Sequence, residues 1–193
     1  MPYYKKLAGA QCYLSPCSPE DAESWTHWFN NLEVALPLGD EAYVPAGLAR
    51  MRADAAAMIQ NKEHVFSIVD LKTDQLLGRC LLFGVDPVNR SAKFGIAIGE
   101  KAFWNQGYGF EATRLLLDYG FNLLNLNSIM LGVFAFNTAA IRCYQKAGFK
   151  EIGRRRQARI IGSRKFDAIF MDILAEEFLG SIIQKMLPEN PQA

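Results

Sequence analysis

The stretch Phe94-Gly-Ile-Ala-Ile-Gly-Glu-Lys-Ala-Phe-Trp-Asn-Gln-Gly-Tyr-Gly-Phe-Glu-Ala112 decides how the rest of this chain is interpreted. Residues 92–98 alternate apolar side chains between two faces, which predicts a strand with Ala92, Phe94, Ile96 and Ile98 in the core. After a short irregular stretch, Gly107-Tyr108-Gly109 opens an amphipathic helix. Backbone N–H groups at a glycine turn before a helix form a site for anions, because no Cβ holds a phosphate away and the helix dipole attracts it. The stretch therefore predicts a strand, a phosphate-binding turn and a helix.

The segments before this stretch predict one packed domain that opens with a short strand and two helices and continues as a meander. Ser18-Pro19 is a typical helix start, and the apolar side chains after it, including Trp25 and Phe29, follow at helical spacing and predict core positions. Polar turns between apolar runs indicate antiparallel strands. We expect a strand at 11–14, helices from Pro19 and at 47–60, and strands at 65–70, 76–85 and 92–98.

The second half of the chain predicts two helices and three further strands. One face of the helix after the glycines carries Ala112, Leu115, Leu116, Tyr119 and Leu123. A buried strand at 128–134 is followed by Asn137, which suits the N-cap of a helix at 138–147, and by Gly148, which suits its end. We expect closing strands at 149–154 and 166–174, a basic segment at 154–164 between them with its turn at Gly162-Ser163, and a frayed tail at 188–191.

Composition restricts the classes of function. The 193 residues are 50% hydrophobic and carry a formal net charge of +1, which favours one globular domain and predicts no nucleic-acid partner. We expect no signal peptide and no membrane span, and therefore a cytoplasmic protein with no membrane partner. The four cysteines form no C-x-x-C pair, so we expect reduced, mostly packed thiols and no metal site.

Residues 107–112 also fit the dinucleotide fingerprint G-x-G-x-x-A, which alone is weak evidence for a nicotinamide oxidoreductase. Its position argues against that interpretation, because dinucleotide domains place the motif after their first strand and follow the second strand with an acidic residue. Here at least four predicted strands precede Gly107, and the strand ending at Phe134 lacks the acid. No Lys-Ser or Lys-Thr follows the glycines, so the Walker motif is excluded as well.

A second motif selects between the remaining interpretations. Asn137-Thr-Ala-Ala-Ile-Arg-Cys-Tyr144-Gln-Lys-Ala-Gly148-Phe149 places Asn137 at a helix start and Tyr144 two turns later on one side of the helix. With the strand–glycine–helix stretch, this resembles the GCN5-related N-acetyltransferase (GNAT) superfamily, in the branch of ribosomal-protein alanine and spermidine acetyltransferases. The resemblance runs from about Gln11 to about Phe178. Trp104 replaces the Gln or Arg of the superfamily's broad motif, as in many members of the branch, and Phe136 stands where the branch often has Glu.

The resemblance implies an α+β fold: a central, mostly antiparallel mixed sheet with splayed central strands at 92–98 and 128–134 and helices on both faces. It implies one N-acetyltransferase domain over residues 1–193, with a core at about 11–178 and a tail at 179–193. Acetyl-CoA would enter the gap between the splayed strands. Its pantetheine arm would contact Ile96, Ala97, Ile98 and Asn137. Its pyrophosphate would be held by the backbone N–H groups of Trp104, Asn105, Gln106, Gly107, Tyr108 and Gly109.

Acetyl transfer to an amine requires a neutral amine, a donor for the oxyanion and an acid for the leaving thiolate. Tyr144 is the predicted acid, because its reference pKa of about 10 keeps it protonated at neutral pH, and a backbone N–H near Ala97 or Ile98 is the predicted oxyanion donor. Glu100 is the predicted base, directly or through water. The alternative interpretation of Tyr144 is a buried tyrosine of the core. The alternative interpretation of Glu100 is a solvated turn residue. Asp167, Glu33 and His64 are weaker candidates for the base.

These observations predict an acetyl-CoA-dependent N-acetyltransferase that acts by direct transfer in a ternary complex. The acceptor is either a protein N-terminus, whose pKa of about 7.7–8.0 leaves part of it neutral, or a small amine or polyamine. The acidic residues of the stretch 33–41 favour a cationic acceptor. The alternative is a non-catalytic acyl-CoA sensor. The oligomeric state is open between a monomer and a homodimer.

Overall fold

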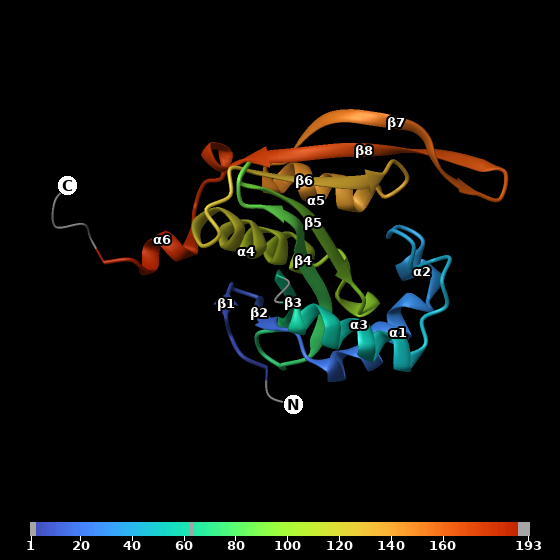
Figure 1. Cartoon of the computed structure of the whole chain (residues 1–193), viewed down its shortest axis with the longest axis horizontal. Helices are drawn as coiled ribbons and strands as arrows, with labels where there is room; N and C mark the ends of the chain where they lie inside the picture. Colours follow the sequence, from blue (N-terminus) through green and yellow to red (C-terminus); the bar gives the residue numbers. More distant parts are fainter. Residues whose placement is uncertain (1–2, 62–63, 189–193) are drawn as a thin grey trace.

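The computed structural model describes residues 3–61 and 64–188. Figure 1 labels its helices and strands, and its short 3-10 helices are called η1 to η3 here. The elements are β1 Leu7–Ala8, β2 Cys12–Pro16, η1 Pro19–Asp21, α1 Ala22–Phe29, α2 Leu32–Ala35, α3 Leu48–Gln60, β3 His64–Asp70, β4 Leu76–Asp86, β5 Ser91–Ile98, η2 Lys101–Phe103, α4 Tyr108–Asn122, β6 Ser128–Phe134, α5 Thr138–Ala147, β7 Lys150–Ile161, β8 Arg164–Leu174, η3 Ala175–Glu177 and α6 Ile182–Met186.

The described strands form one eight-stranded sheet in the order β1-β2-β3-β4-β5-β6-β8-β7. The pairs β3–β4 and β4–β5 are antiparallel and make the predicted meander. The pair β5–β6 is parallel, because α4 returns the chain to the sheet between them. The predicted fold class, a mixed and mostly antiparallel sheet, is confirmed.

The two central strands part as predicted. Strand β5 pairs with β6 through Ser91, Ala92 and Lys93 only, and the register ends there although both strands continue. Beyond that point β6 keeps β8 as its partner along its whole length. The sheet therefore consists of two halves, β1–β5 and β6–β8, which are joined at one end of the β5–β6 seam.

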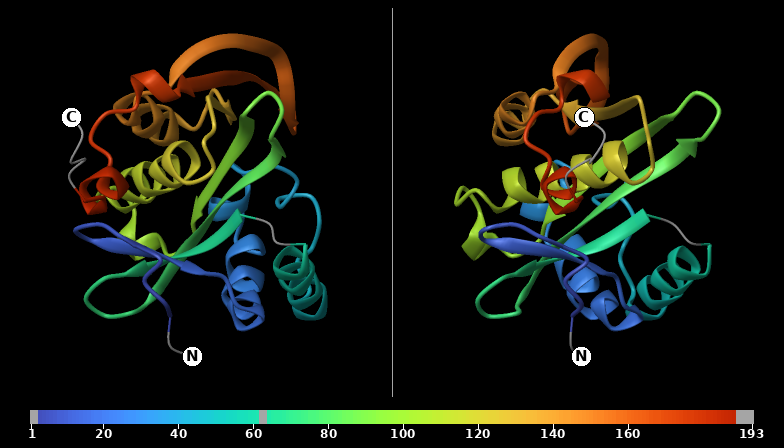
Figure 2. Two further views of the ribbon diagram at one scale, coloured as in Figure 1. Left: turned by 60° about the vertical axis from the view of Figure 1, so that its left-hand side comes forward. Right: turned by 90° about the vertical axis from the view of Figure 1, so that its left-hand side faces the viewer.

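Helices cover both faces of the sheet. Alternate residues of β5 point to opposite sides, so this strand contributes to the apolar core on each face. Phe94 belongs to the core beneath α4, together with Leu82 of β4. Ala97 belongs to a second core with Trp25 of α1 and Met51 of α3. In both views of Figure 2, α1 and α3 lie side by side, away from α4 and α5.

The basic segment 154–164 differs from the prediction. It is not a loop between two strands, because β7 and β8 both extend through it to the turn at Gly162-Ser163. The resulting ribbon extends past the rest of the sheet (Figure 1). The two strands of this ribbon pair with each other, and no residue of the segment 154–164 belongs to the main apolar core. The apolar alternation that predicts strands is therefore absent from its sequence.

Three smaller differences concern the ends of elements. Leu123 follows the last residue of α4 and is 49% exposed, so it is not on the buried face of the helix. The short helix α2 and the strand β1 were not predicted. The expected frayed tail at 188–191 lies almost wholly outside the described residues.

No helix among the described residues has the length and apolar character that a bilayer span requires. The thiols of Cys12 and Cys80 are fully buried.

Candidate cofactor and acceptor site

A cavity of about 1010 Å³ opens where β5 and β6 part. One side, here called the cofactor end, is lined by Gly95–Ile98 of β5, by Trp104–Gly109 in part, and by α5. The other side, here called the acceptor end, is lined by the α2–α3 connection, by α3 and by Arg79 of β4. A volume of this size matches the sites of drug-sized ligands.

The turn before α4 is a phosphate-sized cradle of backbone N–H groups. Gly107 is the N-cap of α4 and has φ of 95°, a left-handed conformation that suits glycine. The first intrahelical hydrogen bond reaches Gly107 from Glu111, so the N–H groups of Tyr108, Gly109 and Phe110 have no helical acceptor. Trp104 donates from Nε1 to the carbonyl of Ile98 at 2.8 Å and fixes the turn against β5.

The structure brings together most of the predicted cofactor residues. Those that line the cavity are Ile96, Ala97, Ile98, Trp104, Asn105, Gly107, Gly109 and Asn137. Two do not line it with their side chains: Gln106 donates to the carbonyl of Ala102, and the Tyr108 hydroxyl donates to Asp70 at 2.7 Å. For Tyr108 only the backbone N–H is therefore placed toward a phosphate.

Asn137 and Tyr144 project from α5 into the same cavity. Asn137 Oδ1 accepts from the N–H of Ala140 at 3.2 Å, which leaves its amide N–H groups for a ligand. Tyr144 is 8% exposed and is held edge-on between Phe94 and Phe149. Burial, with a smaller contribution from Cys143, raises the pKa of Tyr144, so the phenol stays protonated.

Glu100 lies beside the cofactor turn but outside the lining of the cavity. Its Oε1 accepts from Trp28 Nε1 at 2.8 Å, and Trp28 packs on Gly99, where any Cβ would overlap the indole. The role of Glu100 as a base stays a prediction, and from this position it requires a bridging water.

The weaker base candidates are dispersed. Asp167 accepts from the backbone of Gln157, and His64 contacts Tyr119 through Nδ1 at 3.0 Å with its pKa lowered by burial; neither lines the cavity. Glu33 does line the acceptor end, in an ion pair with Lys101 at 2.6 Å.

Charge is unevenly distributed along the cavity. Arg142 and Lys146 of α5 line the cofactor end, where a ligand with phosphates would require positive charge. The acceptor end carries Glu33, Asp40, Glu41, Asp54, Arg50 and Arg79.

Sequence reasoning missed the arginines of the acceptor end. A signal was present, because Arg79 is the single charged residue in the apolar run from Leu76 to Val85. A charge inside a buried strand usually has a specific partner. Arg50 gave no such signal, since it lies in a helix with other exposed charges.

The comparisons with known proteins agree on one family. A family model described as an acetyltransferase (GNAT) domain matches residues 11–150. An uncharacterized N-acetyltransferase p20 of Bacillus licheniformis is 29% identical over 166 residues, which cover 83% of this chain and 91% of that protein. A spermidine N(1)-acetyltransferase of Vibrio cholerae is 35% identical over 121 residues, which cover 62% of this chain and 68% of that protein.

Solved structures give the same result. The spermidine N-acetyltransferase of Vibrio cholerae in complex with CoA and spermine superposes with a TM-score of 0.80 at 26% identity. The match covers 89% of this chain and all of that chain.

Proposed function

The chain belongs to the GNAT acetyltransferase family and is an acetyl-CoA-dependent N-acetyltransferase, and from this premise we propose that it transfers the acetyl group to a small primary amine bound at the acceptor end of the cavity. One observation carries the proposal: β5 and β6 part beside the glycine turn of α4, so a thioester held between them opens onto the charged acceptor end.

The residues of the cofactor end fit CoA chemically. The unpaired N–H groups of the α4 turn and the cations Arg142 and Lys146 suit its phosphates. The edge of β5 beyond Lys93, which β6 leaves free, suits the amides of the pantetheine arm. The amide N–H groups of Asn137 would donate to the same arm. In the residues described, no group of His, Cys, Asp and Glu is arranged to hold a metal ion.

We propose that Tyr144 is the acid of the reaction. The lone pair of the neutral amine attacks the thioester carbonyl carbon, the C–N bond forms, and the oxyanion finds a backbone N–H near Ala97 or Ile98. When the C–S bond breaks, the thiolate takes the phenolic proton of Tyr144, which later regains one from the acceptor nitrogen. Burial raises the pKa of this phenol, so it carries its proton when the thiolate forms.

The general base contributes less to the rate than the orientation of the two substrates does. The acceptor nitrogen must lose one proton before attack and one after it. We retain Glu100 as the candidate base, acting through water, because one of its carboxylate oxygens is bonded to Trp28 and the residue lies outside the cavity. A thioester is activated already, so orientation of the two substrates supplies much of the rate.

Carboxylates at the acceptor end favour an amine that arrives as a cation. Glu33 and Asp40 lie on the rim of the cavity, and their charge raises the local concentration of ammonium groups. The named activities of the Vibrio cholerae relatives, which act on spermidine, support a small amine rather than a folded protein.

A thiol-release assay tests the proposal. The protein is mixed with acetyl-CoA and a panel of primary amines and N-terminal peptides, and free CoA is measured over time. We expect release that depends on the amine. Binding of CoA without release on any acceptor would instead favour the alternative, a non-catalytic acyl-CoA sensor.

A further inference from the structure

We propose that the acceptor amine carries a carboxylate close to its reacting nitrogen, as a free α-amino acid does, and that Arg79 and Arg50 bind this carboxylate. The inference rests on the proposed function and narrows its substrate class. It starts from the two arginines that line the acceptor end of the cavity.

Arg79 lies next to the expected position of the acetyl group. It is paired in register with Ala97, the β5 residue at the cofactor end. Side chains of paired residues on neighbouring antiparallel strands start about 4.5–5.5 Å apart on the same face. The Arg79 guanidinium lies over Trp25 and Phe29, which belong to the same apolar cluster as Ala97, so a group bound by it is on the side of the sheet where an amine would attack beside Ala97.

The surroundings of Arg79 fix its orientation. Its guanidinium carbon lies 4.9 Å from the ring centre of Trp25 and 4.5 Å from that of Phe29. The side chain is only 14% exposed. Aromatic walls hold the planar fork in place and leave its edge for hydrogen bonds, an arrangement that suits bidentate binding of a carboxylate.

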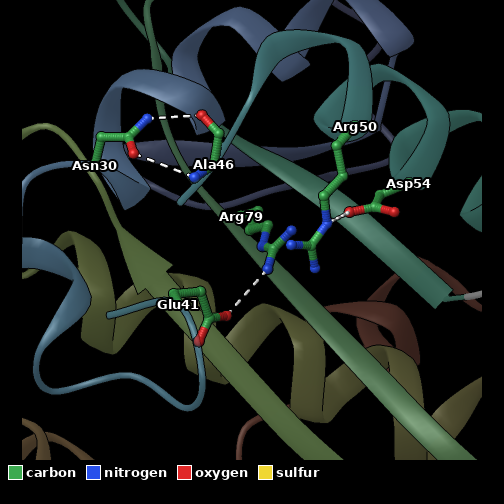
Figure 3. Close-up of polar contacts among 6 residues, drawn as sticks. All are labelled: Asn30, Glu41, Ala46, Arg50, Asp54 and Arg79. Atoms are coloured by element: carbon green, nitrogen blue, oxygen red, sulfur yellow. Dashed lines mark hydrogen bonds and ion pairs between the residues drawn. The ribbon is translucent and has the colours of Figure 1, made fainter. Parts of the chain in front are cut away.

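The hydrogen-bonding capacity of Arg79 is poorly used in the free protein. Its one hydrogen bond to a described residue is from Nη2 to Glu41 Oε1, at a long 3.4 Å. In Figure 3, Arg50 points toward Arg79, and its own contact is a loose one of 3.6 Å between Nε and Asp54 Oδ2. Two guanidinium groups thus line the cavity, and the side-chain polar contact of each, to Glu41 or to Asp54, is a long one.

Burial disfavours the positive charge of Arg79, which is 14% exposed. Desolvation lowers the pKa of Arg79, and the opposing attraction of Glu41 and Asp54 does not restore it. A buried cation requires close, well-directed acceptors. The carboxylate of a ligand, gripped by both arginines, would supply them and would displace Glu41, which lies in the α2–α3 connection.

This pair of arginines distinguishes the acceptors that share the amine. Polyamines have no carboxylate, and a protein N-terminus has an amide at the corresponding position. A free amino acid offers both an amine for the thioester and a carboxylate for Arg79, while Glu33 and Asp40 remain for a basic side chain.

The test compares acceptors that differ only in the carboxylate: lysine with lysinamide and cadaverine, and phenylalanine with phenylalaninamide and phenethylamine. The thiol-release assay gives kcat/KM for each. We expect about tenfold or higher values for the amino acids, the discrimination expected for one good charged contact. Equal or better use of the carboxylate-free amines would overturn the inference while leaving the proposed function intact. Absence of release with every amine would overturn both.

Variants assign the selectivity to residues. Arg79→Met should bring the ratio between each acid and its amide close to one, and Arg50→Gln should lower it several-fold. Arg52→Gln, on an exposed neighbouring position of α3 outside the cavity, is the matched control. The shift of Tm with CoA shows that each variant is folded. Selectivity that survives in folded Arg79→Met would contradict the assignment.

Glu41→Gln tests the inference through the direction in which KM for amino acids changes. This test does not depend on the folding of an Arg79 variant. We expect this change to lower KM for amino acids about threefold, because Glu41 competes with their carboxylate for Arg79. A higher KM would instead mean that Glu41 binds the ammonium of the acceptor, and the inference would be wrong. Glu23→Gln on the exposed face of α1 is its control.

Discussion

Substitution of Tyr144 tests the proposed acid of the reaction most directly. Replacement by Phe keeps the ring contacts with Phe94 and Phe149 and removes only the hydroxyl. We expect kcat to fall about a hundredfold, the lower range for general acid catalysis, while Kd for CoA changes less than about twofold. Tyr119→Phe, a tyrosine of α4 that contacts His64 outside the cavity, is the control. Unchanged kcat in Tyr144→Phe would remove the acid from the mechanism.

Gly109 allows the phosphate cradle to be tested separately from folding. A Cβ at Gly109 would lie 3.7 Å from Ile98 Cγ1, an ordinary contact, so Ala fits the protein itself. Alanine also favours the helix by up to about 1 kcal/mol relative to glycine. We therefore expect Gly109→Ala to unfold at equal or higher denaturant but to bind CoA about tenfold more weakly by calorimetry. Gly153→Ala, at an open position of β7, is the control. Unaltered affinity would place the pyrophosphate elsewhere.

At the scale of elements, Asp70 joins the end of β3 to the start of α4. Its side chain accepts from Tyr108 at 2.7 Å and from the hydroxyl and N–H of Thr73, both at 2.8 Å. Burial would raise the pKa of Asp70, but these hydrogen bonds, with one from the N–H of Lys72, outweigh it and lower the pKa. The same bond to Asp70, followed by burial, raises the pKa of Tyr108 to about 12.

The sign of the pH dependence follows. A carboxyl group whose pKa is depressed in the folded state stabilises the fold above its unfolded pKa of about 3.9 and loses that contribution as pH falls through the folded value. Asp70→Asn should lower the free energy of unfolding by about 1–3 kcal/mol at pH 7, and the gap to the parent should shrink below about pH 4. Urea unfolding from pH 7 to pH 3 measures this, with Glu23→Gln as control. A gap that is constant over this range would show that Asp70 acts by packing alone.

The elements that sequence predicted best are those whose signals are local. Asn137 and Gly148 mark the two ends of α5 through capping chemistry, and alternation marks β3, β4 and β5. The extension of β7 escaped prediction because its residues pair with β8 outside the core, so no periodic burial constrains them.

The candidate site divides in the same way. Its cofactor end depends on backbone and glycine, which leave a short motif in the sequence. Its acceptor end depends on Arg79, Arg50 and Glu41, from β4, α3 and the connection between α2 and α3, which only the folded chain brings together. No spacing rule connects these positions.

At the scale of the whole molecule, the two half-sheets are connected at both ends of the gap between them. At one end, three residue pairs join β5 to β6. At the other, Arg159 of β7 is 5% exposed and donates to the carbonyls of Gly39 at 2.7 Å and Leu36 at 3.3 Å. Its guanidinium also stacks on Tyr43 and Phe134. The half-sheet β6–β8 thus holds the α2–α3 connection, which lines the acceptor end of the cavity, in place.

Because these junctions are narrow, a ligand that fills the gap should stabilise both half-sheets together. CoA at about a hundred times its Kd should add about 2.7 kcal/mol to the free energy of unfolding, or roughly 5–10 °C in Tm for a chain of this size. NADH, the ligand of the rejected dinucleotide interpretation, should add nothing. Hydrogen exchange locates the effect: CoA should slow exchange at Gly95–Ile98 of β5 and at Gly132–Phe134 of β6 in parallel, since both line the cavity. Protection of β5 alone would mean that CoA lies along one strand without bridging the gap. The proposed position of the thioester between β5 and β6 would then be wrong.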